Sequence, residues 1–408
     1  MERHCDVLIV GGGLNGPALA LALASGGLSS VVIDAQPRAR RAAPEFDGRA
    51  YALALSSRRM LAALGLWRDL AAQAQAINDI KISDGRAGEG AAPWHLHFDR
   101  NEIDEGPMGH FLEDRYLRGA LLDAIDGSAL IEHRSETEAV AQAPGPGGIA
   151  VTLGDGSRLR AALLVGCDGR GSRVAARAGI ARLGWEYRQS ALVCAVEHEL
   201  PHHGIAHQFF MPPGPLAILP LPGNRSSIVW TEARDRAAVI AGLEREAYLA
   251  ALRPRFGDFL GGIRLAGARF GYPLGLSLAE SFTAERVALA GDAAHGIHPL
   301  AGQGLNLGLR DVAALAEVLV EAHRRGLDIG APDVLAGYQR WRRFDTAMLV
   351  AATDGLNRLF SNDNPLLRLG RDLGLGLVNR LPALRRGLIR EAAGLAGDLP
   401  KLLLGRPI

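Results

Sequence analysis

Apolar residues near the start of the chain are arranged as expected for a strand, a tight turn, a helix and a second strand. A short apolar run over 7–10 leads into glycines, an Ala/Leu-rich stretch continues to about residue 24, and another apolar run ends at Asp34. Short apolar runs bounded by glycine are typical of buried strands, and a longer Ala/Leu-rich stretch is typical of a helix. Helical spacing recurs over 56–70 and 117–125, which predicts helices that lie on a sheet.

The middle of the chain has a pattern typical of strands. Residues 139–165 form short apolar runs separated by glycine-rich turns, which predicts a hairpin and a following strand. From about 185 to 230, apolar and polar residues alternate between proline-rich turns, as in an antiparallel sheet with one face in solvent. This region is expected to be a second domain, inserted into the first.

The last third of the chain again predicts a strand followed by a helix. An apolar run over 287–290 breaks at Gly291-Asp292, and a glycine cluster leads to a helix expected from about 305 to 323. Because 408 residues exceed the size at which one hydrophobic core stops growing, about two domains are expected. The order of elements predicts an α/β architecture.

The charge balance of the chain excludes partners that need a uniform field. With 45 basic and 44 acidic residues, the whole surface is not expected to hold nucleic acid or an anionic membrane. Cys5, Cys167 and Cys194 lack CxxC spacing, which argues against a disulfide framework, a structural zinc or a dithiol redox centre. We therefore expect no metal site and a cytoplasmic location.

The opening residues have a superficial likeness to a signal peptide, because Arg3 and His4 precede an apolar stretch. Acidic Glu2 and Asp6 flank the start, however, and the glycines at 11–13 would interrupt the apolar region of a signal. No segment of the sequence has the roughly 20 uninterrupted apolar residues of a membrane span. Neither a cleaved leader nor a spanning helix is expected.

A GxGxxG motif formed by Gly11, Gly13 and Gly16 lies between the first expected strand and the first helix, and Asp34 ends the next strand. In this context, glycines permit a tight turn and let backbone N–H groups meet a pyrophosphate at a helix N-terminus. Asp34 would accept hydrogen bonds from an adenosine ribose. The alternative is that the glycines serve only the packing of the helix on the strand.

Two neighbouring segments of the last third extend this picture. Asp292 follows a buried strand, where α/β sheets place ligands, and its carboxylate suits a ribityl hydroxyl. Residues 299–306 combine a proline, glycines and a helix start, which would allow close approach to a flat ring. The glycines within 302–308 do not have the spacing of a second dinucleotide-binding motif, so one resident dinucleotide is expected. A plain strand-to-helix connection remains the alternative.

At this point the chain resembles the single-component flavoprotein hydroxylases typified by p-hydroxybenzoate hydroxylase. The GxGxxG motif, the pair Asp168-Gly169 and the pair Gly291-Asp292 carry that likeness by their order and spacing. More narrowly, the chain is similar to the ubiquinone-biosynthesis hydroxylases that oxidise polyprenylated phenols. The residues that carry this closer likeness, which spans almost the whole chain, are 47–53, 214–221, 291–306 and 354–362.

The resemblance implies a specific division of the chain. It implies an FAD-binding Rossmann-like domain with a three-layer ββα/βαβ core, an inserted antiparallel-sheet substrate domain, and C-terminal helices. The FAD-binding parts are expected at 1–72, 101–180 and 279–350, the substrate-domain parts at 73–100 and 181–278, and the helical region at 351–408.

The resemblance also implies the residues of the site. Gly11, Gly13, Gly16 and Asp34 would hold the ADP half of non-covalently bound FAD, with Arg49 and Arg115 near its phosphates. Asp168 would serve flavin and nicotinamide handling, and Gly291 with Asp292 would bind the ribityl or pyrophosphate region. The residues expected to line the isoalloxazine are Pro299, Gly302, Gln303, Gly304, Leu305 and Asn306, of which Pro299 and Gln303 would position the reacting ring.

This sequence departs from the family pattern at three positions. Asp34 stands where glutamate is usual, and Cys167 replaces a common alanine. Ala175 occupies the place of a common arginine, which puts in doubt a basic contact from that helix unless Arg173 or Arg177 substitutes.

The chemistry implied by the resemblance needs little from the protein. NADPH or NADH, bound transiently, would reduce the flavin, O2 would give a C4a-hydroperoxide, and an electron-rich phenol would attack its distal oxygen. The protein would position the ring, exclude water and stabilise a phenolate. His295, His298 and the pair His202-His203 are expected to have structural or substrate-edge roles.

The C-terminal region from Asn357 has nine basic and four acidic residues, with leucines at helical intervals interrupted at Pro382. Such a stripe could rest on an anionic inner membrane that stores a lipid-tailed substrate, near other quinone-biosynthesis proteins. The alternative is that these leucines pack on the body of the protein.

Three competing functions remain at this point. A catabolic hydroxylase of a small soluble phenol would lack a long apolar tunnel. An NAD-dependent dehydrogenase would share the first motif but would be colourless. A non-catalytic flavin-bearing subunit of a biosynthetic assembly would be yellow without NAD(P)H-driven oxygen uptake.

Overall fold

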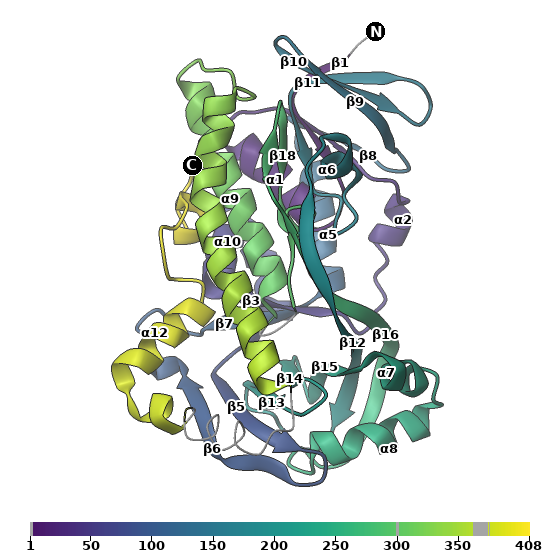
Figure 1. Ribbon diagram of the computed structural model, residues 1–408, viewed down its shortest axis with the longest axis vertical. Helices are drawn as coiled ribbons and strands as arrows, with labels where there is room; N and C mark the ends of the chain where they lie inside the picture. Colours follow the sequence, from purple (N-terminus) through teal and green to yellow (C-terminus); the bar gives the residue numbers. More distant parts are fainter. Residues whose placement is uncertain (1–2, 299–301, 362–373, 375) are drawn as a thin grey trace.

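The computed structural model describes residues 3–298, 302–361, 374 and 376–408. Its upper half in Figure 1 contains a largely parallel sheet, and its lower half contains a second sheet. The α/β class expected from the sequence is confirmed.

The upper sheet is built on buried apolar strands. Its strand order is β17-β18-β11-β1-β2-β8, and β1 pairs in parallel with both β11 and β2. Val7, Leu8 and Ile9 are fully buried, because helices and a further strand layer cover both faces of such a sheet. The bounds are β1 (Arg3–Val10), β2 (Ser30–Ile33), β8 (Ile131–Arg134), β11 (Arg158–Gly166), β17 (Thr283–Ala284) and β18 (Val287–Leu289).

The helices of the upper half join segments that are distant in sequence. Helix α1 contacts both α5 and α9, and α9 contacts α10, so the first and last thirds of the chain share one core. The hairpin expected over 139–165 is present and pairs with β11. The bounds are α1 (Asn15–Ser25), α2 (Arg38–Arg41), α5 (Asp114–Asp126), α6 (Arg173–Arg177), α9 (Gln303–Arg324), α10 (Pro332–Phe360), β9 (Ala139–Gly145) and β10 (Gly148–Leu153).

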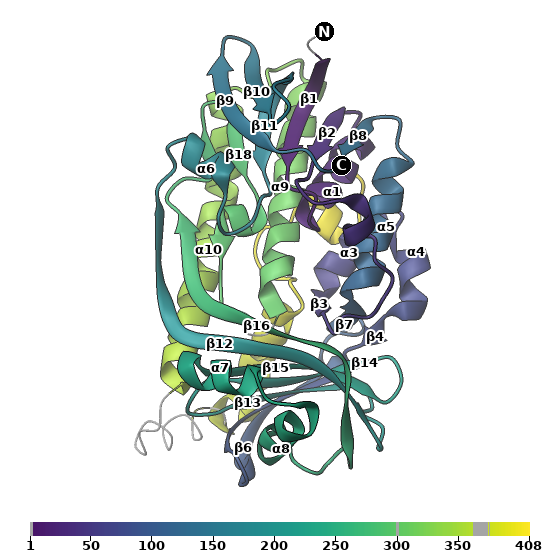
Figure 2. The same ribbon diagram turned by 90° about the vertical axis from the view of Figure 1, so that its right-hand side faces the viewer.

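The lower sheet has the order β19-β16-β12-β15-β14-β13-β5-β6. Figure 2 shows the long strands β12 and β16 running side by side from the upper half into this sheet. Helices α7 and α8 cover its outer face around a separate apolar core. The bounds are β5 (Asp79–Arg86), β6 (Gly90–Asp99), β12 (Arg182–His198), β13 (Ile205–Phe210), β14 (Leu216–Leu221), β15 (Arg225–Ala233), β16 (Ile263–Ala279), β19 (His295–Gly296), α7 (Arg234–Ala241) and α8 (Arg245–Phe256).

A small antiparallel sheet lies between the two larger ones, in the order β3-β7-β4. The single helix expected over 56–70 is instead two helices, α3 and α4, because the chain turns at Gly65 with φ of 80°. That left-handed backbone conformation suits glycine and ends α3. The bounds are β3 (Ala50–Ala54), β4 (Gln75–Ala76), β7 (Gly109–Glu113), α3 (Leu55–Ala63) and α4 (Trp67–Leu70).

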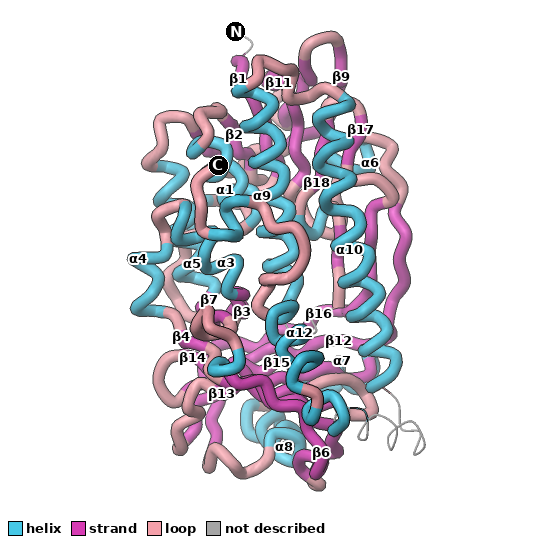
Figure 3. Tube along the Cα trace, turned by 90° about the vertical axis from the view of Figure 1, so that its left-hand side faces the viewer, coloured by secondary structure: helices cyan, strands magenta, loops and turns pink. Residues whose placement is uncertain are grey.

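The C-terminal segment ends with α12 (Pro382–Ala392) and the 3-10 turn η5 (Lys401–Leu404). Figure 3 shows α12 below the sheets' junction, near the lower half of α10. Among the described residues, no helix is both long and apolar enough to cross a membrane.

Candidate cofactor and active site

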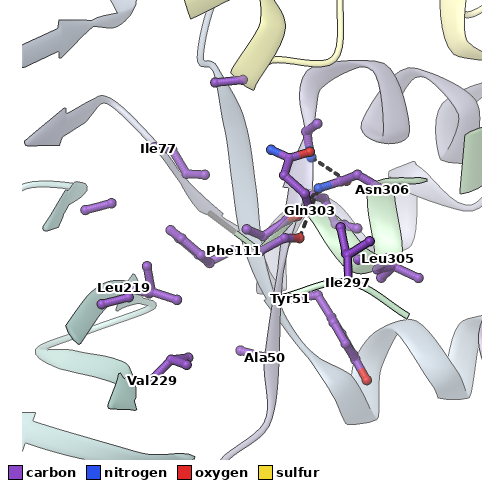
Figure 4. A pocket seen from close by; sticks show the side chains of 18 of the residues that line it. Ala50, Tyr51, Ile77, Phe111, Leu219, Val229, Ile297, Gln303, Leu305 and Asn306 are labelled. Atoms are coloured by element: carbon purple, nitrogen blue, oxygen red, sulfur yellow. Dashed lines mark hydrogen bonds between the residues drawn. The ribbon is translucent and has the colours of Figure 1, made fainter. Parts of the chain in front are cut away.

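A cavity of about 520 Å³ lies where the upper sheet, the small sheet and the lower sheet meet. Figure 4 shows Gln303, Leu305 and Ile297 on one side of it and Leu219, Val229 and Ile77 on the other. Segments from the start, middle and last third of the chain therefore share one site, as the motifs predicted.

The glycine turn after β1 is held so tightly that side chains are excluded at two positions. Gly11 has φ of 114°, and a Cβ there would lie 2.3 Å from the Cys167 carbonyl oxygen. A Cβ at Gly16 would lie 2.0 Å from the Gly11 carbonyl oxygen. At Gly13, by contrast, a Cβ would meet no atom within 4 Å. Gly13 therefore opens onto free space beside the N-terminus of α1, where an anionic group is favoured.

Asp34 lies at the end of β2 beside this turn and is 5% exposed. Its Oδ1 accepts a hydrogen bond from the Gln36 N–H at 2.8 Å, and its Oδ2 lies 2.9 Å from an Arg41 guanidinium nitrogen. A Cβ at Gly12 would lie 2.4 Å from Asp34 Oδ2. The carboxylate is thus next to the glycine turn, as a ribose contact would require.

Gly291 and Asp292 follow β18 at the carboxyl edge of the upper sheet. Gly291 has φ of 65°, and its N–H donates to Asp311 Oδ2 at 3.0 Å. Asp292 lines the cavity and is half-exposed, with Arg170 Nε at 3.5 Å from its Oδ2. The cavity itself exposes this carboxylate, so a ligand in the cavity can reach it.

A buried cluster of ion pairs supports the Gly291 turn. Asp311 and Arg342 are fully buried and joined at 2.8 Å, and His295 Nε2 lies 2.5 Å from the other Asp311 oxygen. Burial alone would raise the pKa of Asp311, but the charges and hydrogen bonds of His295 and Arg342 outweigh it and lower the pKa. Tyr338 donates to the Leu289 carbonyl at 2.7 Å, which ties α10 to the same strand end.

The loop before α9 approaches the small sheet closely. Gly302 has φ of 64°, and a Cβ there would lie 2.9 Å from that of Ala52. The Asn306 amide accepts hydrogen bonds from the Ala54 N–H and the Ser57 hydroxyl and donates to the Ala52 carbonyl. Asn306 thus fixes β3 against α9. Gly302, Gln303, Gly304, Leu305 and Asn306 all line the cavity, whereas Pro299 lies outside the described residues.

The two predicted arginines and Asp168 are not among the residues that line the cavity. Arg49 pairs with Asp47 at 2.6 Å and Asp114 at 3.4 Å. Arg115 donates to Glu113 and to the Pro44 carbonyl, each at 2.8 Å. Asp168 accepts the backbone N–H groups of Arg173 and Val174 and so caps α6. Their cofactor roles stay predictions.

The substitutes proposed for the missing arginine at Ala175 do not reach the cavity. Arg173 pairs with Glu138, and Arg177 Nε donates to Gln142 at 3.2 Å. Cys167 lines the cavity, and burial together with the Asp168 and Asp311 charges raises the pKa of its thiol. The thiol is therefore protonated and unreactive at neutral pH.

The histidines singled out in the sequence contact other groups of the protein. His295 belongs to the Asp311 cluster, and the His298 ring packs edge-on against Tyr187 at 5.3 Å. His202 Nε2 donates to the Leu221 carbonyl, and its Nδ1 accepts the Gly204 N–H. In the described part of the chain, no three His, Cys, Asp or Glu side chains are grouped as metal ligands.

The opposite wall of the cavity is one face of the lower sheet. Ile82, Gln208, Ala217 and Val229 lie side by side on β5, β13, β14 and β15 in a single row of the register. Gln208 is the polar member of this otherwise apolar row, and its Nε2 donates to the Leu216 carbonyl at 3.3 Å. Sequence analysis missed Gln208, because alternation predicts a strand's face but not which polar residue lies opposite a ligand.

The glycine turn and its surroundings fit a flavin dinucleotide. Gly13 leaves room for a bound group at the N-terminus of α1, Asp34 lies beside it, and the Asn15 side-chain oxygen is buried at the cavity without a hydrogen-bond partner in the described residues. The open backbone at the helix N-terminus suits a phosphate, and the Asp34 and Asn15 oxygens suit groups that donate hydrogen bonds, such as ribose hydroxyls.

Comparison with known proteins gives the same result. The chain matches the family model described as FAD binding domain over residues 4–351. It is 46% identical to ubiquinone hydroxylase UbiL of Rhodospirillum rubrum, over 100% of this chain and 94% of that protein. The chain belongs to this family of FAD-dependent monooxygenases. The sequence-based recognition is confirmed.

Two further comparisons concern a second relative and the fold. It is 35% identical to 3-demethoxyubiquinol 3-hydroxylase of Escherichia coli, over 97% of this chain and 100% of that protein. Its fold is similar to that of p-nitrophenol 4-monooxygenase PnpA from Pseudomonas putida DLL-E4. The TM-score is 0.81 at 21% identity, covering 98% of this chain and 100% of that one. FAD is the cofactor, and NAD(P)H and O2 are the co-substrates typical of the family.

Proposed function

We propose that this monooxygenase hydroxylates the aromatic ring of a polyprenylated phenol in ubiquinone biosynthesis. The names of the two relatives support the pathway. The observation that carries the proposal is the cavity, whose sheet wall is apolar except for Gln208 and His207.

The charges around the cavity favour an uncharged ring. Among its described lining residues, only Arg170 and Asp292 are charged, and they face each other at 3.5 Å. His207 also borders the cavity, and burial with the Lys81 charge lowers its pKa to about 4, so it is neutral at pH 7. A ring carboxylate would have no free cation to bind and would lose its hydration. A neutral phenol with an apolar tail fits better than a small phenolic acid.

We assign the cofactor residues as the resemblance suggests. Gly11, Gly13, Gly16 and Asp34 would hold the ADP half of FAD, and Gly291, Asp292 and residues 302–306 would hold its ribityl chain and ring. When bound, FAD supplies the redox chemistry, because it takes electrons from NAD(P)H and activates O2. Arg49, Arg115, Asp168 and Pro299 remain proposed contributors.

The residues of this chain have three tasks in the reaction. The Gly302 turn and the Asn306 amide hold the cavity's upper wall, so that Gln303 and Leu305 keep fixed positions. The apolar row of the lower sheet binds the ring and keeps water out, which limits the wasteful release of peroxide. Gln208 offers both a donor and an acceptor to the ring oxygens.

The test compares two substrates with the purified holoenzyme. A 2-polyprenylphenol should stimulate NAD(P)H oxidation and give a hydroxylated product, whereas the same phenol carrying a ring carboxylate should do neither. Preference for the carboxylated ring or for a small soluble phenolic acid would overturn the proposal and favour a catabolic role.

We also propose peripheral contact with the inner membrane through α12 and the residues before it, near other proteins of quinone biosynthesis. Leu377, Leu381, Leu384 and Leu388 are 39% to 61% exposed, which leaves a large part of each side chain available to a lipid surface. Exposed leucines bordered by Arg386 are typical of an interfacial helix. Leu369 and Leu373 of the expected stripe lie outside the described residues.

Two arginines of the basic C-terminal region form ion pairs with acidic residues of the protein body. Arg385 pairs with Glu102 at 2.8 Å and Arg390 with Glu105 at 2.5 Å, so both fix α12 to the body. Replacing them would loosen α12 as well as remove charge. The sharper variant is Leu384→Gln with Leu388→Gln, which should lower flotation with anionic vesicles. Equal flotation of variant and wild type would remove the membrane proposal.

A further inference from the structure

The outer face of the lower sheet, which is turned away from the active-site cavity, changes character across its width. On β14 and β15, Ile218 and Ile228 of this face are buried in the apolar core under α7 and α8. The same row of the register continues from Ile218 through His207 of β13 to Lys81 of β5. Figure 2 shows α8 below the sheet, on the side away from the upper half. The face is therefore apolar and covered up to β14 and polar from β13 onward.

A groove of about 1100 Å³, here called the outer groove, lies over the polar part of this face. Its lining includes Lys81, Ser83 and His95 on the sheet and residues 253–260 at the end of α8. The Gly88 N–H donates to the Pro254 carbonyl at 2.6 Å, which ties the turn between β5 and β6 to α8. The outer groove is thus a concave site with walls that are joined to each other.

Two cations of the outer groove are available to a ligand. Lys81 on the sheet and Arg253 on α8 form no ion pair and no side-chain hydrogen bond within the described part of the chain. Arg255 also lines the groove, but it pairs with the buried Glu232 at 3.0 Å. Cations without a counter-charge in a concave site attract an anion.

Two acidic residues line the outer groove as well. Glu89 already interacts with another residue of the protein, whereas Asp258 is exposed. An anion would therefore bind toward Lys81 and Arg253. The Asp258 carboxylate suits a part of the ligand that donates hydrogen bonds, such as the hydroxyls of a ribose.

An aromatic ledge, formed by Phe209, His207 and Phe259, adjoins these charges. The His207 ring lies 5.9 Å from the Phe209 ring and 4.7 Å from the Phe259 ring. Phe259 also stacks at 5.6 Å on Phe256, which is 1% exposed, so the ledge is fixed to the core. Phe259 itself is 41% exposed. An exposed ring held in this way offers a stacking surface to a flat heterocycle.

A residue with an unusual backbone also lines the outer groove. His203, between β12 and β13, has a left-handed conformation with φ of 55°. Asn78 Nδ2 donates to its carbonyl at 3.1 Å, and the His202 ring accepts the Gly204 N–H. Such a conformation is uncommon for a residue with a side chain and is concentrated at functional sites. The exposed His203 ring can donate or accept a hydrogen bond at the edge of a bound heterocycle.

We propose that the outer groove binds a nucleoside phosphate at a site separate from the active-site cavity. The base would stack on Phe259, the ribose hydroxyls would donate to Asp258, and the phosphates would bind Lys81 and Arg253. The sheet separates the two sites, because Ile82 faces the active-site cavity while the preceding Lys81 faces the groove. The proposal does not depend on the substrate that the enzyme hydroxylates.

The size and polarity of the outer groove disfavour two other anions. A single-ring aromatic acid would fill little of a cavity at the upper end of the usual range for ligand sites. A fatty acid would have to place its alkyl chain against Lys81, Ser83 and His95, whose polar groups would lose water without gaining a partner. A nucleoside phosphate offers each kind of lining residue a partner.

Titration calorimetry of the FAD-loaded holoenzyme with ADP tests the site, because bound FAD keeps ADP out of the dinucleotide turn. Lys81→Met and Arg253→Gln should each raise the dissociation constant at least tenfold, as for one lost hydrogen bond to a charged group. Arg343→Gln is the matched control, since Arg343 is exposed on α10 and does not line the groove. The KM for NAD(P)H should be unchanged in all three variants.

Two further variants separate the parts of the ligand and separate binding from folding. Phe259→Leu should weaken binding of ADP but not the weaker binding of inorganic phosphate, because only the base stacks on the ring. His203→Gly removes the side chain and relieves the left-handed backbone, so it should weaken ADP binding while the melting temperature stays equal or rises. A melting temperature that falls with the loss of ADP binding would assign His203 a structural role and remove it from the site.

Three results would overturn the proposal. The first is no heat of binding with millimolar ADP. The second is equal ADP affinity of wild type, Lys81→Met and Arg253→Gln, which together with competition against NAD(P)H would place ADP at the reductant's site. The third is tighter binding of dodecanoate than of ADP, which would assign the outer groove to an acyl chain.

Discussion

The cofactor-side wall of the cavity, formed by residues 11–16, 291–292 and 302–306, differs from the sheet-side wall in what fixes its shape. On the cofactor side, backbone approaches backbone so closely that Gly11 and Gly16 have no room for a Cβ. On the sheet side, alternating side chains such as Ile82, Ala217 and Val229 make the surface. Backbone therefore fixes the shape of the first wall, whereas single substitutions can change the shape of the second.

The largest effect is expected at the support of the cofactor-side wall. Asp311→Asn would remove the buried one of the two carboxylates that pair with Arg342, which should cost about 3 kcal/mol of stability and weaken the contact with the Gly291 N–H. Urea unfolding measures this loss. Asp345→Asn removes the other, partly exposed partner of Arg342 and is the control, with an expected cost below about 1 kcal/mol. Equal losses would show that the buried cluster has no special role.

A second prediction separates the two functions of the glycine turn. Gly11→Ala places a Cβ against the Cys167 carbonyl at a positive φ, so it should destabilise the fold by about 3 kcal/mol. Gly13→Ala meets no protein atom within 4 Å, so it should fold normally and yet lose FAD. Flavin absorbance and unfolding curves measure the two effects. Full flavin content in Gly13→Ala would show that no phosphate lies there.

A third prediction concerns the sheet-side wall. Gln208→Leu removes its neutral amide, so binding of a prenylphenol should weaken about fivefold to tenfold, as for one lost hydrogen bond. More of the NAD(P)H consumed should yield peroxide. Flavin content should stay unchanged, unlike in the glycine variants. The double variant Gln208→Ile with Ile82→Gln moves the amide one strand along, about 4.8 Å, and should not restore coupling. Unchanged binding by Gln208→Leu would remove this residue from the site.

The smallest expected effect is the pH dependence of stability that His298 causes. This residue lies four positions before Gly302 in the chain. His298 is 1% exposed, and burial with the Arg170 charge lowers its pKa from 6.5 to about 4. The unfolded chain binds a proton near pH 6.5, while the folded state does not until about pH 4. Stability should therefore fall as pH decreases through this window and be unaffected above it.

His298→Phe, which keeps a ring against Tyr187, should remove this contribution. Between pH 7 and pH 6 the wild type should lose roughly 0.7 kcal/mol more than the variant. Urea unfolding of both proteins at the two pH values measures the difference. Parallel losses would mean that His298 titrates normally in the fold.

The two walls also differ in how far the sequence predicted them. Gly11 and Gly16 could be found because backbone contacts leave only glycine, and Gly291 because of its positive φ and the nearby Asn15 side chain. Such constraints produce recognisable motifs. The strands of the lower sheet were found from alternation, which also indicates two faces. Alternation does not show which strands are neighbours, so the row that joins Gln208 to Ala217 and Val229 required the three-dimensional structure.

Long-range ion pairs were not predictable for a related reason. Asp311, Arg342 and His295 lie on separate segments and have no characteristic spacing in sequence. Arg385 and Arg390 belong to the nine basic residues counted after Asn357, and their acidic partners, Glu102 and Glu105, could not be identified because they are distant in the chain. The division into domains and the cofactor roles of single residues remain predictions.

The central claim, that this cavity brings FAD, oxygen and an uncharged prenylated ring together, is tested most directly by isotope labelling. The holoenzyme is supplied with NAD(P)H, a 2-polyprenylphenol and 18O2, and the product is analysed by mass spectrometry. The claim predicts one 18O atom in a new ring hydroxyl, formed in proportion to NAD(P)H consumed. Consumption of NAD(P)H with 18O recovered only in hydrogen peroxide, or a hydroxyl oxygen derived from water, would contradict it.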